Sequence, residues 1–168
     1  HPPAGRGYGI ELVASDDGGA SWRVLARLGA EQYLTESRLA ELDDGTLLLN
    51  ARGDRPDLSQ WRFESRSGDG GETWSPPEAV RGLGESFRCD AGLARVGGSL
   101  LFAKGADPLE RRCMTVRLSD DGGRTWPHGR VVYDGAAYYC DLAALPDGTA
   151  ALLYLKGRLN RWRGLEVS

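Results

Sequence analysis

The sequence predicts an all-β protein built from repeated four-stranded units, as in a β-propeller. One octet recurs as SDDGGASW, SGDGGETW and SDDGGRTW, and its copies begin at Ser15, Ser67 and Ser119, a constant step of 52 residues. About 25 residues after each octet begins, a stretch with an Asp-Gly or Gly-Gly pair and a following apolar segment indicates a hairpin. Convincing helical periodicity is absent. Four short strands in a unit of about 50 residues are typical of a propeller blade.

The strands are expected on both sides of these turns. The segment IELVA (residues 10–14) precedes the first octet, and WRVLARL (residues 22–28) follows its turn. Further hairpins are expected in ELDDGTLLLNAR, ARVGGSLLFAKG and ALPDGTAALLYLKG, which occupy residues 41–52, 94–105 and 144–157. We therefore expect residues 1–168 to form one partial propeller domain of about three four-stranded antiparallel blades. The octets occupy residues 15–22, 67–74 and 119–126.

Each octet is expected to be a folding device and not a ligand-binding motif. The aspartate at its third position can accept hydrogen bonds from the N–H groups of the turn, and the glycine pair permits positive φ. The tryptophan at the eighth position would pack back over the hairpin as a large apolar plug. These residues are Asp17, Asp69 and Asp121, and Trp22, Trp74 and Trp126.

Three units do not close a ring. Propellers typically have 4 to 8 blades, and an open fan of blades would leave unpaired strand edges. The first residues include neither an initiator methionine nor a signal peptide. We therefore expect the chain either to be a fragment of a longer propeller or to close with missing blades or a partner. Its sequence alone does not predict its localisation.

Composition favours a soluble globular protein and excludes several classes. Of the 168 residues, 40% are hydrophobic and 27% are charged, and the net charge is −3 with scattered basic residues. This distribution predicts neither a nucleic-acid partner nor a polybasic membrane patch, and no apolar run approaches the roughly 18 residues of a membrane-spanning helix. The three cysteines lack CxxC spacing, so we expect no metal site and no cofactor.

The octet resembles the Asp-box, or BNR repeat, of sialidases (neuraminidases), which other families also carry. A more specific resemblance lies in TESRLAELDDGTLLLNAR, residues 35–52. It is similar to the sialidase segment N-E-x-x-x-x-E-L-x-D-G-x-L-x-x-N-x-R, with Thr35 in place of the common asparagine. The resemblance implies that Glu36 partners the nucleophile and that Arg52 binds the substrate carboxylate.

A second stretch, RRCMTVRLSDDGGRTWP, is similar to R-x-N-L-T-V-R-L-S-x-D-x-G-x-T-W-P of the same family. The resemblance implies that Arg111 is another ligand of the substrate carboxylate, and Cys113 stands where asparagine is common. Arg112 is the alternative. Neighbouring residues of a strand face opposite sides, so only one of the two arginines can point into a site.

A third stretch, AAYYCDLAALPDGTAALLY, resembles A-Y-S-D-L-x-x-L-x-D-G-x-I-G-L-L-Y-E. It implies that Tyr139 is the nucleophile, with Cys140 in the position of the serine, and Tyr138 is the alternative. Either tyrosine could instead be a core aromatic of a central strand.

The resemblance covers nearly the whole chain and implies the later part of a six-bladed exo-α-sialidase that acts on sialylated glycoproteins, glycolipids and oligosaccharides. Sialic acid carries a carboxylate on its anomeric carbon, so a neutral tyrosine activated by a base suits the reaction better than a carboxylate nucleophile. Forked arginines suit the binding of that carboxylate. The resemblance also favours a secreted or cell-surface protein.

The chain departs from the family in two respects. It contains neither the F-R-I-P motif with the first carboxylate-binding arginine nor the acid/base aspartate of the early blades, and Leu155 replaces a common glutamate. We therefore expect little or no hydrolysis by these 168 residues alone. A non-catalytic Asp-box propeller that binds glycan or protein is the alternative function, and a degenerate, inactive product is a third interpretation.

Overall fold

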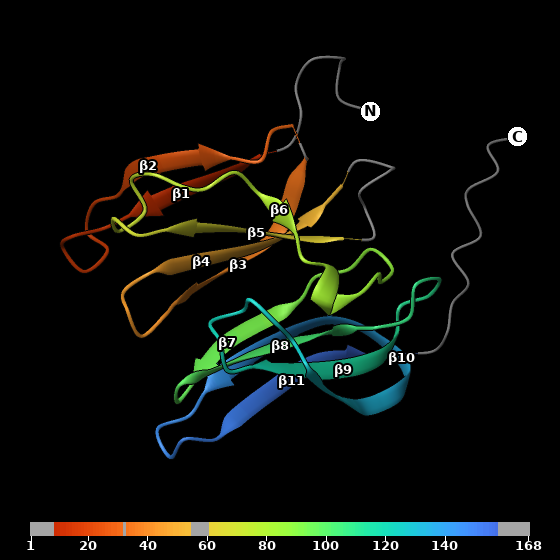
Figure 1. Cartoon of the computed structure of the whole chain (residues 1–168). Helices are drawn as coiled ribbons and strands as arrows, with labels where there is room; N and C mark the ends of the chain where they lie inside the picture. Colours follow the sequence, from red (N-terminus) through yellow and green to blue (C-terminus); the bar gives the residue numbers. More distant parts are fainter. Residues whose placement is uncertain (1–8, 32, 55–60, 158–168) are drawn as a thin grey trace, which may run out of the picture.

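The computed structural model describes residues 9–31, 33–54 and 61–157. These residues form eleven strands and one short 3-10 turn, Arg81–Leu83, and Figure 1 shows the strands in layers of antiparallel sheet. The first two sheets contain β1 (Ile10–Ala14), β2 (Arg23–Leu28), β3 (Leu34–Glu41), β4 (Leu47–Gly53), β5 (Arg62–Ser67) and β6 (Glu78–Ala79). The third contains β7 (Gly92–Val96), β8 (Ser99–Gly105), β9 (Arg112–Ser119), β10 (His128–Ala144) and β11 (Ala150–Lys156).

Two complete blades lie in the middle of the chain. Strands β3, β4, β5 and β6 pair consecutively and antiparallel in one four-stranded sheet. Strands β7, β8, β9 and the first part of β10 form the second blade in the same order. In both blades the octet connects the third strand to the fourth, because it begins at the last residue of β5 or β9.

The described residues therefore begin and end in the middle of a blade. The first octet connects β1 to β2, so these two strands correspond to the third and fourth strands of a preceding blade. Strand β10 continues beyond its pairing with β9 and, from Ala137 to Ala144, pairs with β11 as the first strand of a following blade. The predicted all-β blade architecture is confirmed, and the strands divide into two whole blades flanked by two half blades.

The first strands of successive blades lie next to one another. Strand β7 contacts both β3 and β10, as expected for strands around a common axis. Gly92 at the start of β7 makes this approach possible, because a Cβ atom there would lie 3.0 Å from the backbone nitrogen of Leu142 in β10.

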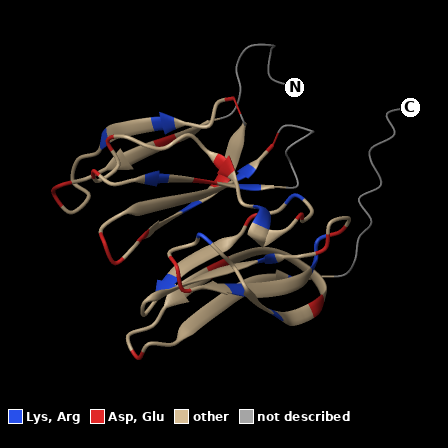
Figure 2. Cartoon of the chain, viewed as in Figure 1, with Lys and Arg blue, Asp and Glu red and all other residues tan. Residues whose placement is uncertain are grey.

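Acidic and basic residues are interspersed over all the sheets (Figure 2).

The main core fills the space between the two complete blades. Leu48 and Ala40 from one blade pack with Leu100 and Phe102 from the other. Trp126 of the third octet joins this cluster, with its ring centroid 5.8 Å from that of Phe102.

The octet tryptophans differ in burial. Trp126 is 4% exposed and acts as the expected plug, and Trp74 is half-buried. Trp22 folds back over Gly19 and donates a hydrogen bond to its carbonyl oxygen, yet remains 64% exposed. Trp22 thus folds back over its hairpin as predicted, but it stays exposed because no described element packs over it.

The three octets each form the same pattern of hydrogen bonds. The serine hydroxyl accepts a bond from the backbone N–H four residues later, at 2.7 Å from Gly19 and at 2.8 Å from Gly71 and Gly123. The aspartate carboxylate accepts bonds from the backbone N–H and the hydroxyl of the residue four positions later, which is Ser21, Thr73 or Thr125. The network is local, as the sequence predicts for a structural turn.

Hydrogen bonds hold the octet carboxylates in the ionised form. Bonds from Ser21 and Ser15 lower the pKa of Asp17 to about 2, and bonds from Thr73 and Ser67 do the same for Asp69. Burial acts to raise the pKa of Asp121, but bonds from Thr125 and Ser119 outweigh it and the value is again about 2. Each carboxylate therefore favours the folded state as long as it is ionised.

We predict that removing the octet serine hydroxyl is costly where the turn is buried. Ser119→Ala leaves the N–H of Gly123 without its partner in a buried turn, which should lower the free energy of unfolding by about 1–3 kcal/mol. Ser15→Ala is the matched control, because it removes the same bonds from an exposed turn where water can replace them. Urea denaturation measures both variants, and equal losses would contradict the prediction.

We also predict a loss of stability in acid. The octet aspartates have folded-state pKa values of about 2 against an ordinary value of 3.8, so their contribution is complete above about pH 4 and disappears as the pH falls toward 2. The urea midpoint should therefore decrease steadily from about pH 4 to pH 2.5. Asp69→Asn should flatten that decrease, and a midpoint that stays constant down to pH 3 would count against this account.

Candidate functional site

Glu36 and Arg52 lie side by side on the first two strands of the β3–β6 blade. An Nη1 nitrogen of Arg52 is 3.2 Å from Oε2 of Glu36, an ion pair by distance without a well-aligned hydrogen bond. Arg52 also contacts Asp54 at 2.9 Å and donates to the Thr35 hydroxyl at 3.3 Å. Its side chain is only 12% exposed, so these contacts fix the guanidinium in one orientation.

Glu36 is held in an unusual backbone conformation. Its φ is 44°, in the left-handed region, and the pairing of β3 with β4 shifts register between Thr35 and Arg38. Such bulges redirect a side chain out of the regular alternation of a strand. The buried side chain of Arg62 secures the bulge, because its Nη2 donates to the carbonyl oxygen of Glu36 at 3.1 Å and its Nε donates to Asn50 Oδ1 at 2.7 Å.

Tyr139 on β10 and Arg111 just before β9 form a second pair. The guanidinium carbon of Arg111 lies 5.7 Å from the centroid of the Tyr139 ring, and its Nε donates to the carbonyl oxygen of Arg88 at 2.9 Å. The Tyr139 side chain is 46% exposed. Tyr139 also lies where the register of β10 against β11 shifts, between Ala137 and Cys140.

The alternative residues point elsewhere. Arg112 donates to the carbonyl oxygen of Asp134 through Nε and Nη2, at 3.3 and 3.1 Å. The ring of Tyr138 lies over Gly157, where an added Cβ atom would be 2.6 Å from it. Neighbouring residues thus diverge, as the alternation of a strand requires, and Arg111 contacts the ring of Tyr139.

Burial raises the pKa of the Cys89 thiol, and the charges of Arg111 and Glu36 act on it with smaller, opposite effects. Within the residues that the structure describes, no hydrogen bond or ion pair joins the Glu36–Arg52 pair to the Tyr139–Arg111 pair.

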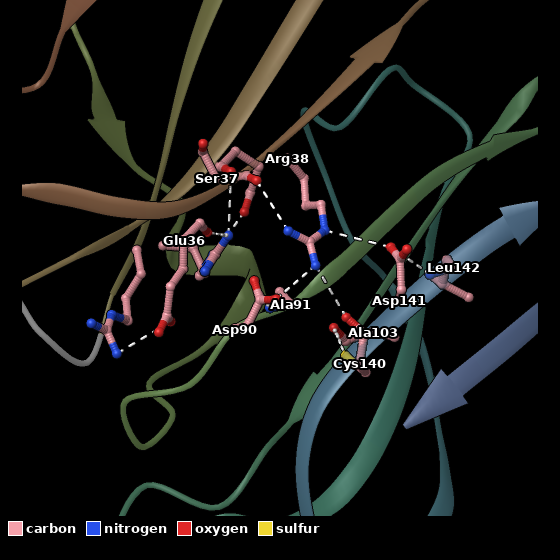
Figure 3. A network of polar contacts seen from close by, with 12 residues as sticks. Glu36, Ser37, Arg38, Asp90, Ala91, Ala103, Cys140, Asp141 and Leu142 are labelled. Atoms are coloured by element: carbon pink, nitrogen blue, oxygen red, sulfur yellow. Dashed lines mark hydrogen bonds and ion pairs between the residues drawn. The ribbon is translucent and has the colours of Figure 1, made fainter. Parts of the chain in front are cut away.

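An arginine that the sequence analysis did not single out connects the inner strands beside the site. Figure 3 shows Arg38 extending from β3 toward Asp90 and Asp141, and its Nη2 is 2.6 Å from Asp90 Oδ2 while its Nε is 3.5 Å from Asp141 Oδ1. Nη2 also donates to the carbonyl oxygen of Cys140 at 3.3 Å. Arg38 thus fixes β10, which carries Tyr139, relative to β3, which carries Glu36.

The sequence carried a signal that Arg38 and Asp141 lie beside the site. Arg38 stands two positions after Glu36, and Asp141 two positions after Tyr139, so each would share a face with the predicted site residue on a regular strand. Arg62 carries a weaker signal, because a charge in a strand with apolar neighbours suggests a buried role. For Asp90 the local sequence offered none.

The described residues contain neither a metal-binding cluster nor a membrane-spanning helix. No group of three or more histidine, cysteine, aspartate or glutamate side chains there is arranged to hold a metal ion. None of the helical segments described is long and apolar enough to cross a membrane.

Comparison with known proteins gives the geometry a context. A sialidase from Micromonospora viridifaciens is 37% identical over 166 residues, which is 93% of this chain and 25% of that protein. A sialidase from Bacteroides fragilis (strain YCH46) is 29% identical over 155 residues, which is 85% of this chain and 27% of that protein. The chain therefore spans about a quarter of the length of these curated relatives.

The solved structures agree. The structure of a Hadza microbial sialidase, Hz136, superimposes with a TM-score of 0.73 at 28% identity and covers 84% of this chain and 29% of its own. Sialidases with this likeness are β-propellers, so the blades described above are part of that architecture. The sequence-family model for the BNR repeat-like domain matches residues 2–153 of this chain. The chain thus belongs to the family of BNR repeat-like domains.

Proposed function

We propose that this chain carries the nucleophile and two of the carboxylate ligands of a retaining exo-α-sialidase. The observation that carries the proposal is the contact of Glu36 on β3 with Arg52 on β4, and of Tyr139 on β10 with Arg111 just before β9. Its relatives are named sialidases, and the four residues occupy the positions that the resemblance assigns to these roles.

The chemistry follows from the charge of the substrate. The phenol oxygen of Tyr139 would attack the anomeric carbon while Glu36 takes up the phenol proton, and the bond to the departing glycan would break. Water would then displace the tyrosine from the same carbon, so that two inversions give retention of configuration.

Two features of the Glu36–Arg52 pair suit these roles. The contacts of Arg52 with Glu36, Asp54 and Thr35 leave its orientation fixed before a ligand arrives, which lowers the entropic cost of binding. The bond from Arg62 to the Glu36 carbonyl holds the carboxylate on a defined bulge. Sialylated glycans are the proposed substrates.

A second candidate function is glycan or protein binding without hydrolysis. Leu155 lies on β11, in the last half blade, and stands where the resemblance predicts a glutamate. It is 58% exposed. A leucine cannot brace an arginine, so the full set of carboxylate ligands would be incomplete. Binding without turnover would then be the expected behaviour.

We predict that the two arginines bind the carboxylate of a sialic acid analogue. The probe is 2-deoxy-2,3-didehydro-N-acetylneuraminic acid, titrated into the chain by calorimetry. Arg52→Lys and Arg111→Lys should each weaken binding about 10–100-fold, because forked charge-assisted bonds are lost. Arg112→Lys is the matched control and should change affinity less than threefold, roughly. Loss of binding in the Arg112 variant alone would reject the assignment.

We predict that Tyr139, and not Tyr138, supports turnover. The assay is release of 4-methylumbelliferone from its sialoside, whose leaving group departs without protonation and so bypasses a missing general acid. Slow release by the chain should fall at least about a hundredfold in Tyr139→Phe and remain in Tyr138→Phe. Affinity for the analogue should survive in both variants. Equal loss in both would contradict the role of Tyr139, and binding without any release by the unaltered chain would favour the second candidate function.

A further inference from the structure

A small cavity lies between the two complete blades, below the bulge that carries Glu36. It has a volume of about 10 Å³, and its lining includes Arg62 of β5, Phe102 and Lys104 of β8, and Thr115 of β9. A cavity of about this size holds a single small occupant, such as one water molecule. Three of its lining residues are cations, Arg62, Lys104 and the partly buried Arg117, and the first two form a buried pair. Buried cations are unusual in the space between sheets.

Both cations of this pair are buried and incompletely bonded. The Arg62 side chain is among the largest fully buried in the described chain, with 1% exposure, and Lys104 has 3%. Nε and Nη2 of Arg62 are used by Asn50 and by the carbonyl oxygen of Glu36, but Nη1 has no hydrogen-bond partner. Nζ of Lys104 has no partner either. Donors that are buried without an acceptor are costly, so an occupant that accepts hydrogen bonds is expected.

The nearby carboxylates do not neutralise these charges. Glu36 makes its ion pair with Arg52, and Asp90 makes its own with Arg38. Burial raises the pKa of Glu64 to about 7, and its oxygens contact Asn50 and Arg66. Neither Arg62 nor Lys104 has a carboxylate within ion-pair distance among the described residues.

We propose that the cavity is a binding site for a small monovalent anion, chloride under ordinary conditions, held between Lys104 and Arg62. An anion accepts hydrogen bonds from both unpaired donors and compensates their charge, whereas a water molecule would satisfy the donors and leave the charge uncompensated. The site joins β5 of one blade to β8 of the next. It stands independently of the proposed hydrolase activity, because it contacts no residue that would touch the sugar through its side chain.

Protonation of Lys104 should couple anion binding to pH. Burial lowers the pKa of Lys104 to about 7, and the charge of Arg62 acts in the same direction, with smaller effects from Cys89, Arg52 and Glu36. Burial lowers the pKa of Arg62 only to about 10, so Arg62 stays charged. The anion should therefore bind better at pH 6 than at pH 8.5, where the lysine amine is mostly neutral.

The test is the melting temperature of the chain in sodium chloride against sodium gluconate, at constant ionic strength and pH 6. An anion that binds only the folded state should raise the melting temperature by about 4 °C for each tenfold increase in chloride above its dissociation constant. Lys104→Met, which keeps the volume but removes the charge, should abolish the dependence on chloride. Lys156→Met is the matched control, because Lys156 lies outside the cavity over the Tyr133 ring, and it should retain the dependence.

A second readout needs no variant. Crystals of the unaltered chain soaked in sodium bromide should show an anomalous peak between Lys104 and Arg62. Each of three results would overturn the proposal. The first is a melting temperature that does not change with chloride, and the second is an equal change in Lys104→Met and in the unaltered chain. The third is the absence of a bromide peak in the cavity. If Lys104→Met does not fold, the bromide peak and the loss of the chloride effect at pH 8.5 decide the question.

Discussion

The buried guanidinium of Arg62 is the contact on which the rest of the arrangement depends. It bonds to Asn50 and to the Glu36 carbonyl in its own blade, and its central carbon lies 5.8 Å from the centroid of the Phe102 ring in the next blade. One side chain thus sets the backbone at the candidate base and contributes to the packing between blades. Its replacement would disturb the bulge and the interblade core together.

Backbone strain is concentrated near the candidate site. The non-glycine residues with positive φ are Tyr33, Glu36 and Cys113 in the described part of the chain. Such a conformation costs on the order of 1–3 kcal/mol and persists only where surrounding contacts impose it. The hydrogen bond from Arg62 to the Glu36 carbonyl imposes this conformation on Glu36. Cys113 lies two residues after Arg111, where the pairing of β9 with β10 shifts register. The inner strands are therefore irregular where the chemistry is proposed and regular elsewhere.

Local sequence was sufficient to predict the turns and hairpins. The octets form the expected network because all its bonds join residues within four positions, and the Asp-Gly and Gly-Gly pairs lie at hairpin tips. The pairing of Glu36 with Arg52 also follows from a hairpin, since β3 and β4 bring two residues far apart in sequence into contact. These features depend on contacts within one turn or one hairpin, and such contacts follow from the order of residues along the chain.

Other features depend on contacts between blades and were not predictable from one sequence. The octet spacing indicated repeating units, but it did not indicate where each blade begins, so the half blades at both ends emerged only from the strand pairing. The exposure of Trp22 has the same origin. Arg38 contacts Asp90 and Arg62 contacts Phe102 across the boundary between blades, and Lys104 lines a cavity together with Arg62. No local pattern in the sequence identifies these contacts.

Strand β10 has a mechanical consequence. A single stretch of 17 residues closes one blade and opens the next, so no flexible connection separates them at this point. Cutting or extending the chain within β10 would break hydrogen-bond ladders in two sheets at once, whereas the hairpin tips at Gly45 or Gly97 belong to only one sheet each. New chain ends created by circular permutation should accordingly be tolerated at those tips and rejected in the shared strand.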